Sequence, residues 1–406
     1  MIPWEEALAT VLAGCRPLAP QRVPWREALL GQVLASPVLA AAPVPPFANT
    51  AMDGYAVRAA DVATVPVRLP VVAVVGAGHP TARRLSPGEA MRIFTGAPIP
   101  EGADAIVIVE NTSRVADGAE VEIHEPAVPG AHIRPAGDDV APGDVVISPG
   151  VELTAGRLGA ARSVGAFVLE LHPRPRVGVL STGDELVPGD GPLGPGQIYD
   201  SNRPTLLALV ASAGAVPVDL GHAGDDEAAI TATISRGFET CDMVLSTGGV
   251  SMGDTDLVKV VLDRLAGSAM RWMQVAIRPA KPLAFGVVGG VPMVGLPGNP
   301  VSSMVSFELF ARPGLRRRAG YPDSRLQRPR LRAVADEPLT RRSDGKVVFV
   351  RVVARVIDGQ LRVRSAGGQG SHQLSAMARA NALAVLPDGP GVDVDEEVEV
   401  LLLGDL

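Results

Sequence analysis

The sequence predicts a multidomain protein of the α/β plus β class, with a central three-layer α/β domain whose sheet is parallel or mixed. The chain has 406 residues, which suffices for about two to four domains. Residues 174–316 alternate apolar strands with amphipathic helices, a pattern typical of a parallel sheet with helices on both faces. The flanking segments instead carry short β-rich runs broken by glycine and proline.

Four regions follow from this pattern. Residues 1–43 carry two similar amphipathic stretches, "PWEEALATVLAG" and "PWREALLGQVLAS", and 144–173 include "TAGRLGAARSVGAF", so these two segments are expected to form one helical region. Residues 44–143 are expected to form a small, mostly β domain. Residues 174–321 form the predicted α/β domain, and 322–406 a C-terminal β domain of barrel-like type.

The composition excludes several classes of function. A net charge of −7 argues against a nucleic-acid surface and against binding to an anionic membrane. The N-terminus lacks the pattern of a signal peptide, and no apolar run is long enough to span a bilayer. The two cysteines lie far apart and the six histidines are scattered, so zinc or iron is disfavoured and a reducing cytoplasm is the expected compartment.

The stretch "VGLPGNPVSS" (294–303) predicts a turn from a buried strand into a helix that stops near the next proline and glycine. Glycine allows a ligand to approach the backbone closely, and proline suits the first turn of a helix. Free N–H groups at the helix start make this turn an anion-site candidate, with these residues as ligands: Pro297, Gly298 and Asn299. The alternative is a tight loop that binds nothing.

Two further strand ends leave the predicted sheet through Ser-Thr-Gly, in "VLSTGDEL" (179–186) and "VLSTGGVSMGDTDLVK" (244–259). Each turn presents hydroxyl groups and open backbone, which suit a phosphate. The candidate ligands are Ser181, Thr182, Gly183, Gly248, Gly249 and Ser251.

Acidic residues accompany the same strand ends. Glu185 follows the first, Asp225 and Asp226 form a pair, and Asp256 precedes a helix. Several carboxylates beside phosphate-binding turns suit Mg²⁺, which takes a few carboxylates plus substrate oxygens. Any one of these acids alone is more typical of a helix cap or a solvated surface, and for Asp254 the cap is favoured. The indication of a metal site therefore comes from the set.

Two cations and an unusual turn complete the candidates. Arg278 and Lys281 lie in "AIRPAKPLAFG", a segment that its prolines stiffen. There they would neutralise an oxyanion such as phosphate or molybdate, unless the segment is an ordinary surface hairpin. Asp53 in "PPFANTAMDGYAV" and Thr95 in "FTGAPIPEGADAIV" lie in exposed turns with more polar groups than a connector needs, although Asp-Gly is also ordinary hairpin chemistry. No P-loop, dinucleotide-binding or nucleophile-elbow motif is present.

These motifs, in this order and together with "GSHQLSAMARANALAVLP", resemble the molybdopterin molybdenumtransferase family, which includes MoeA and the C-terminal part of gephyrin. The resemblance covers essentially the whole chain. It implies insertion of molybdate into adenylylated molybdopterin, with Mg²⁺-dependent release of AMP. It also implies an elongated homodimer of four domains, in which the helical region mediates dimerisation, the α/β domain binds the pterin, and the partner subunit completes the active cleft.

The resemblance assigns roles residue by residue. It makes Asp53, Thr95, Glu185, Asp225, Asp256 and Lys281 catalytic, with Glu185, Asp225 and Asp256 as the magnesium ligands. It places Arg278, Ser302, Arg351 and Ser371 where the family handles molybdate and phosphates. Position 278 is often lysine in the family, position 254 is often glutamate, and the choice of Asp225 over Asp226 is open by one place.

Two alternatives belong to other classes of protein. A molybdopterin adenylyltransferase resembles the α/β segment alone, so the flanking domains count against it. A non-catalytic, gephyrin-like scaffold would not need the acids at the strand ends. Expected partners are a second copy of the chain, the upstream adenylyltransferase and acceptor molybdoenzymes. The sequence does not decide between molybdate and tungstate.

Overall fold

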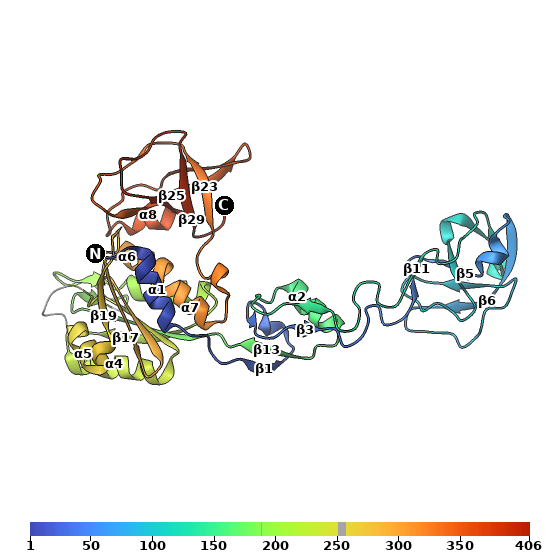
Figure 1. Cartoon of the computed structure of the whole chain (residues 1–406), viewed down its shortest axis with the longest axis horizontal. Coiled ribbons are helices and arrows are strands. Elements are labelled where there is room, and N and C mark those ends of the chain that lie inside the picture. Colours follow the sequence, from blue (N-terminus) through green and yellow to red (C-terminus); the bar gives the residue numbers. More distant parts are fainter. Residues whose placement is uncertain (188, 251–256) are drawn as a thin grey trace.

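The computed structural model describes residues 1–187, 189–250 and 257–406. Figure 1 shows an elongated molecule. An α/β module (α1 and 176–318) and a C-terminal β module (330–402) lie together at one end, and a small β module (49–134) lies at the other. A stem (21–40 and 145–172) joins the two ends, and the chain passes through it twice.

The α/β module is built on one mixed sheet. Its strand order is β17 (Val216–Ala223), β14 (Arg176–Thr182), β18 (Met243–Thr247), β22 (Val291–Leu296), β21 (Pro282–Val288) and β19 (Arg271–Gln274). The first four strands are parallel, and the last two join antiparallel. The central strands are almost wholly buried because helices cover both faces. The predicted three-layer α/β architecture is confirmed.

Two groups of helices cover this sheet. One face carries α4 (Glu227–Thr240) and α5 (Leu257–Ala266) with the short η5 (Gly267–Ala269). The other face carries α1 (Trp4–Gly14), α3 (Asn202–Ser212), α6 (Pro300–Ser306), the π-helical turn η6 (Phe307–Ala311) and α7 (Arg312–Arg318). The last three follow without a break, so the predicted stop at the proline is wrong: Pro313 stands in the first turn of α7, where a missing N–H is tolerated.

Helix α1 packs on the α/β module. Its buried side chains recur at helical spacing, and they join the cluster that contains Phe310 and Leu315. The sequence pattern grouped this helix with the rest of 1–43 in one helical region. In the structure α1 instead packs on the α/β module, because that module offers an apolar surface for the buried side chains of α1.

The stem is mostly β, and the predicted helix over "PWREALLGQVLAS" is wrong. Only η1 (Glu27–Leu29) is helical there, because Gly31 turns at φ +82° and the buried Leu29 and Leu34 face one core. The stem strands are β1 (Gln21–Pro24), β13 (Val168–His172) and β2 (Val33–Leu34) in one sheet, and β3 (Val38–Leu39) with β12 (Val145–Ile147) in another. Helix α2 (Ala155–Ser163) is confirmed and begins at the cap Thr154, whose hydroxyl accepts the Arg157 N–H.

The small β module matches its predicted β character. Its sheet has the order β8 (Ala105–Ile108), β5 (Gly54–Val57), β7 (Ala90–Ile93), β6 (Val67–Val75), β10 (Glu120–Ile123) and β9 (Thr112–Val115). A second pair is β4 (Asn49–Thr50) with β11 (Ile133–Arg134), and the short helices are η2 (Ala59–Val62), η3 (Val109–Asn111) and η4 (Ala116–Gly118).

The C-terminal β module is a closed barrel, as predicted. Five strands run β25 (Val347–Ile357), β26 (Gln360–Ser365), β23 (Arg330–Ala335), β29 (Glu397–Leu402) and β27 (Ala382–Leu386), and β27 pairs back onto β25. The remaining elements are β24 (Leu339–Thr340) with β28 (Gly391–Val392), α8 (Leu374–Arg379) and η7 (Asp323–Arg325). In the α/β module, β15 (Leu186–Val187) pairs with β16 (Ile198–Tyr199).

Strand pairing joins the barrel to the α/β module, and an ion pair holds the segment that leads into the barrel. Strand β20 (Ile277–Arg278) leaves the α/β module and pairs in parallel with β25. In η6, the buried Glu308 carboxylate accepts two hydrogen bonds from Arg328, at 2.8 and 3.0 Å, and Arg312 lies 3.8 Å from it. No helix in the described residues is long and apolar enough to cross a membrane.

We expect Glu308→Ala to destabilise the junction strongly. Removing one partner of a buried ion pair leaves the two arginines uncompensated, at a cost of about 3–5 kcal/mol in the free energy of unfolding. The matched control is Glu397→Ala, which removes an exposed pair with Arg332 and is expected to cost at most about 1 kcal/mol. Differential scanning calorimetry checks both, and equal shifts of the first transition would contradict the assignment.

Candidate functional site

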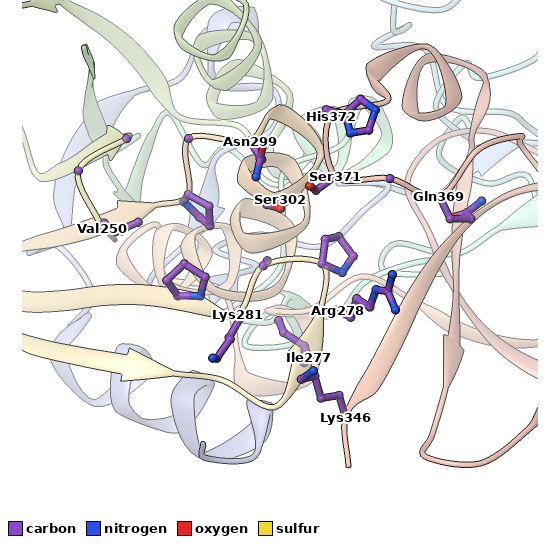
Figure 2. A pocket seen from close by; sticks show the side chains of 18 residues that line it. Val250, Ile277, Arg278, Lys281, Asn299, Ser302, Lys346, Gln369, Ser371 and His372 are labelled. Atoms are coloured by element: carbon purple, nitrogen blue, oxygen red, sulfur yellow. The ribbon is translucent and has the colours of Figure 1, made fainter. Parts of the chain in front are cut away.

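A cavity of about 760 Å³ lies where the α/β module meets the C-terminal β module. The turns after β18 and β22, the segment 277–282, Lys346 and residues 369–372 line it (Figure 2). The carboxyl ends of parallel strands are where ligands bind in such sheets. Among the described lining residues three are cationic and none is acidic, so the cavity favours an anion although the chain is acidic overall.

Glycine is required at the turn after β18. Gly248 and Gly249 have φ of +89° and +70°, and a Cβ on Gly249 would lie 2.3 Å from side-chain atoms of Val258. Gly298, in the turn after β22, lies beside Gly248, since a Cβ on Gly298 would be in van der Waals contact with the Cα of Gly248 at 3.7 Å. The two turns therefore lie against each other and present backbone to the cavity.

Asn202 joins these two turns. Its side-chain amide donates to the Thr247 hydroxyl (2.8 Å) and to the Gly298 carbonyl (2.6 Å). The Thr247 hydroxyl in turn donates to the Pro297 carbonyl (3.3 Å). Asn202 is the first residue of helix α3. Its amide thus holds the two cavity-facing turns at a fixed spacing. The sequence gives only a weak indication of this role of Asn202, namely that asparagine is rare in the chain, with five in total.

The sequence predicts free N–H groups at the start of α6, but the first two residues of this helix offer none. Pro300 has no N–H, and the Val301 amide donates to the Ser371 carbonyl of the C-terminal β module at 3.1 Å. This bond brings Ser371 to the cavity, beside Asn299 and Ser302, which line it as predicted. The helix start therefore anchors the opposite wall as well as facing the cavity.

Arg278 and Lys281 flank one turn of the lining, since Arg278 ends β20 and Lys281 directly precedes β21. Both side chains are exposed. Within the described residues neither has an ion-pair partner, so both charges are available to an anion. A guanidinium binds an oxyanion as a fork, whereas an ammonium acts as a point charge. The pair can hold a doubly charged oxyanion.

The predicted acids Glu185 and Asp225 lie at the same edge of the sheet as the cavity and do not line it. Glu185 and Asp225 follow β14 and β17, which are neighbouring parallel strands. The Asp226 carboxylate caps α4 by accepting the Ala228 N–H at 2.9 Å, whereas the Asp225 carboxylate makes no such bond within the described chain. The Asp226 carboxylate is thus engaged as a helix cap, whereas that of Asp225 is not.

The described residues contain no group of three or more His, Cys, Asp or Glu side chains able to hold a metal ion. Two of the three predicted magnesium ligands are described, and the third, Asp256, lies outside the described residues, as does Ser251. Mg²⁺ is commonly bound by one or two carboxylates plus substrate phosphates. Glu185 and Asp225 fit that mode of binding.

Ser181 and Arg351 are buried and have partners inside the protein. The Ser181 hydroxyl donates to Asp200 at 2.6 Å. The Arg351 side chain is 1% exposed and donates to the carbonyls of Gly368 and Gly370 at 2.8 and 3.2 Å. Burial lowers the pKa of Arg351. It supports the loop that carries Ser371 and lines a second hollow of about 550 Å³.

Asp53 and Thr95 form one unit in the small β module. Asp53 Oδ1 accepts the Thr95 N–H and hydroxyl, both at 2.8 Å. These bonds hold the pKa of Asp53 below its ordinary value, so the exposed carboxylate is ionised at neutral pH. Figure 1 shows β5, which follows Asp53, at the opposite end of the chain from α6. Within one chain the pair lies far from the cavity.

The cavity thus brings together these predicted residues: Gly248, Gly249, Arg278, Lys281, Pro297, Gly298, Asn299, Ser302 and Ser371. It does not include these: Asp53, Thr95, Ser181, Thr182, Gly183, Glu185, Asp225 and Arg351. Sequence reasoning missed three lining residues, Lys346, Gln369 and His372. Lys346 and Gln369 lie outside the quoted motifs, whereas His372 lies inside "GSHQLSAMARANALAVLP" but was not singled out.

Comparison with known proteins gives whole-chain matches. Residues 2–165 match the family pattern of the MoeA N-terminal region (domain I and II), 178–317 that of a probable molybdopterin binding domain, and 332–403 that of the MoeA C-terminal region (domain IV). A molybdopterin molybdenumtransferase 2 of Mycobacterium tuberculosis is 42% identical over 95% of this chain and 94% of its own length. The molybdopterin molybdenumtransferase of Haemophilus influenzae is 37% identical over 91% and 90%.

A solved structure agrees with these matches. The crystal structure of a molybdopterin biosynthesis MoeA protein from Pyrococcus horikoshii superposes with a TM-score of 0.82 at 31% identity and covers 100% of both chains. The similarity therefore extends over the α/β module, both β modules and the stem.

We expect Asn202→Ala to weaken anion binding at the cavity. Loss of two hydrogen bonds, each worth about 0.5–1.5 kcal/mol, lets the two turns move apart. The Kd for inorganic pyrophosphate should rise about tenfold by isothermal titration calorimetry. The control Asn111→Ala changes an exposed amide of the small β module and should leave binding unchanged. Unaltered affinity in Asn202→Ala would show that the amide does not hold the site.

Proposed function

The chain belongs to the molybdopterin molybdenumtransferase family, and from that premise we propose that the cavity binds adenylylated molybdopterin and molybdate for metal insertion with release of AMP. The protein is a transferase of molybdenum cofactor biosynthesis. The observation that carries the proposal for the cavity is its chemistry: two glycine-lined turns and exposed cations, with no acidic side chain among its described lining.

The oxyanions of both substrates match this lining. Molybdate, as the inorganic substrate, meets Arg278 and Lys281, whose charges have no competing carboxylate within the described residues. The pyrophosphate of the nucleotide meets the backbone of the turns at Gly248 and Gly298, where glycine permits close approach. In a site that excludes water such fixed charges stabilise developing negative charge strongly. Positioning is the main contribution of the protein.

We infer that Glu185 and Asp225 hold Mg²⁺ together with the substrate phosphates, with Asp256 as the third predicted ligand. Both described carboxylates end neighbouring strands and lack an ion-pair partner in the described part of the chain. When bound, Mg²⁺ would spread the charge of the phosphoanhydride from which AMP departs. The side chains of Glu185 and Asp225 keep the ion at the edge of the sheet.

The thiolate ligands of molybdenum are supplied by the pterin dithiolene in this proposal. Cys15 and Cys241 are free and buried, and burial raises the pKa of the Cys15 thiol to about 12. Neither is available as a metal ligand. Two unpaired thiols also suit the reducing cytoplasm as the compartment, where the upstream adenylyltransferase and acceptor molybdoenzymes would meet this protein.

A second copy of the chain completes the site in our proposal. Hydrogen bonds hold Asp53 and Thr95 together as one exposed unit, but this unit lies at the end of the molecule opposite the cavity of its own chain. The stem exposes apolar side chains that a partner would cover, namely Leu30, Leu39, Val145, Phe167 and Val168. In an antiparallel dimer formed through the stem, each small β module would reach the cavity of the other chain.

The alternatives are disfavoured. A molybdopterin adenylyltransferase would not need the stem and the two β modules, to which the family match extends. A scaffold would not need a cavity with this charge pattern.

The decisive assay combines the purified protein with adenylylated molybdopterin, Mg²⁺ and molybdate, and measures released AMP and metallated cofactor. We expect Asp225→Asn to lose at least about 90% of AMP release. The adjacent Asp226→Asn should keep turnover and lose about 1 kcal/mol of stability, because it weakens the cap of α4. Full turnover by Asp225→Asn would reject its role as a magnesium ligand, and no AMP release by the unaltered protein would favour the scaffold.

Mixed dimers test the shared site. Asp53→Ala and Lys281→Met, each nearly inactive alone, are expected to regain up to about a quarter of the unaltered activity when co-refolded or co-expressed. Half of the chains in a random mixture form mixed dimers, and each such dimer retains one complete site. Absence of any recovery, with mixed dimers demonstrated by differently tagged chains, would place Asp53 outside the partner's site.

A further inference from the structure

We propose that Lys346 is a third anion-binding side chain of the cavity, contributed by the C-terminal β module to hold a substrate oxyanion. This proposal rests on the proposed function of the cavity. Neither the sequence motifs nor the family resemblance pointed to this residue, which stands in the ordinary loop "RRSDGKVV" (341–348).

The backbone fixes Lys346 beside the other cations. Lys346 directly precedes β25, whose first residue, Val347, donates its N–H to the Ala276 carbonyl at 2.9 Å. The parallel register then places Val348 opposite Arg278. Lys346 lines the same cavity as Arg278 and Lys281, and Figure 2 shows the three side chains around one turn. The placement follows from strand pairing and not from the flexible lysine stem.

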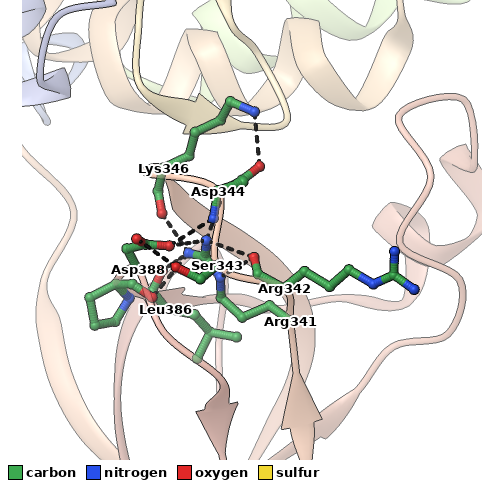
Figure 3. A network of polar contacts seen from close by, with 8 residues as sticks. Arg341, Arg342, Ser343, Asp344, Lys346, Leu386 and Asp388 are labelled. Atoms are coloured by element: carbon green, nitrogen blue, oxygen red, sulfur yellow. Dashed lines mark hydrogen bonds and ion pairs between the residues drawn. The ribbon is translucent and has the colours of Figure 1, made fainter.

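A buried arginine holds the loop that carries Lys346. The Arg341 side chain is 4% exposed, and its guanidinium donates to the carboxylates of Asp344 (2.8 Å) and Asp388 (2.7 Å) and to the carbonyl of Pro387 (3.0 Å). It also donates to the Lys346 carbonyl itself. Figure 3 shows these bonds converging under the loop. The backbone at Lys346 is therefore held in place, and the residue lines the cavity.

The partner of Lys346 can release it at little cost. The Lys346 ammonium lies 2.9 Å from Asp344 Oδ2, and the two side chains are 24% and 32% exposed. The other oxygen of the same carboxylate is bound by Arg341, so Asp344 stays paired when Lys346 turns away. A partly exposed ion pair of this kind contributes little stability. A multiply charged oxyanion in the cavity would compete successfully for the ammonium.

The negative charge of the proposed substrates requires a third cation in the cavity. Molybdate and a pyrophosphate together carry more negative charge than Arg278 and Lys281 neutralise. Lys346 supplies a further positive charge from the wall opposite the strand ends. The C-terminal β module would thereby take part in binding, beyond closing the cavity.

The scarcity of lysine makes a direct test possible. The chain has three lysines, namely Lys259, Lys281 and Lys346. Lys259 lies on α5, with its ammonium 5.8 Å from the ring centre of Trp272, and does not line the cavity. Amine acetylation followed by mass spectrometry measures the reactivity of each lysine in the full-length protein. We expect molybdate or inorganic pyrophosphate to protect Lys281 and Lys346 at least about threefold and to leave Lys259 unaffected.

The pattern of protection separates the two proposals. Protection of Lys281 without Lys346 would overturn the role of Lys346 and leave the cavity as the anion site. Protection of neither residue by either anion would overturn the proposed cavity function together with this inference. The separate molybdate and pyrophosphate arms identify which oxyanion Lys346 meets.

Variants test the same point in turnover. Lys346→Met is expected to raise the KM of the protected substrate about tenfold with kcat within about twofold, and Lys346→Arg should restore most of the affinity. The control Lys259→Met should leave both constants unchanged. A Lys346→Met protein with a lowered Tm and an unaltered KM would show that the lysine only stabilises its loop.

Discussion

The short pairing between β20 and β25 is the contact on which the candidate site depends. Strand β20 lies within the sequence of the α/β module but pairs with β25 of the barrel. The turn that carries Arg278 and Lys281 is therefore held by both modules. The Val301–Ser371 bond fixes the other side of the same junction. Backbone hydrogen bonds hold strands in a defined register, so the cavity has a definite width in spite of lying between two modules.

The electrostatics of the site are local. The chain carries a net charge of −7, yet its described cavity lining has three cations and no acid. The carboxylates nearby, on Glu185 and Asp225, lie along the neighbouring strand ends instead. This separation lets anion-binding groups and candidate metal ligands occupy one sheet edge without pairing with each other. An ion pair between them would cancel the charge that a substrate needs.

The stem sets the distance between the two candidate halves of the reaction site. It is built from two distant stretches of sequence that fold onto one small core. It keeps the Asp53–Thr95 unit away from its own cavity, and it exposes apolar side chains along its length. A second copy of the chain would satisfy both features, since it would cover the apolar surface and bring the unit to a cavity.

The sequence by itself predicted the alternation of strands and helices, the barrel-like C-terminal module and the glycine-rich turns that face the cavity. Periodicity and the placement of glycine are local properties of a chain. Sequence reasoning failed over "PWREALLGQVLAS", whose apolar spacing suits a helix but whose Leu29 and Leu34 serve a stem core formed with a segment more than a hundred residues away. Tertiary structure alone decided that Asn202 joins two turns, that Asp226 is a cap and that Lys346 reaches the cavity. Each of these depends on which side chains from distant segments meet, and no local pattern encodes that.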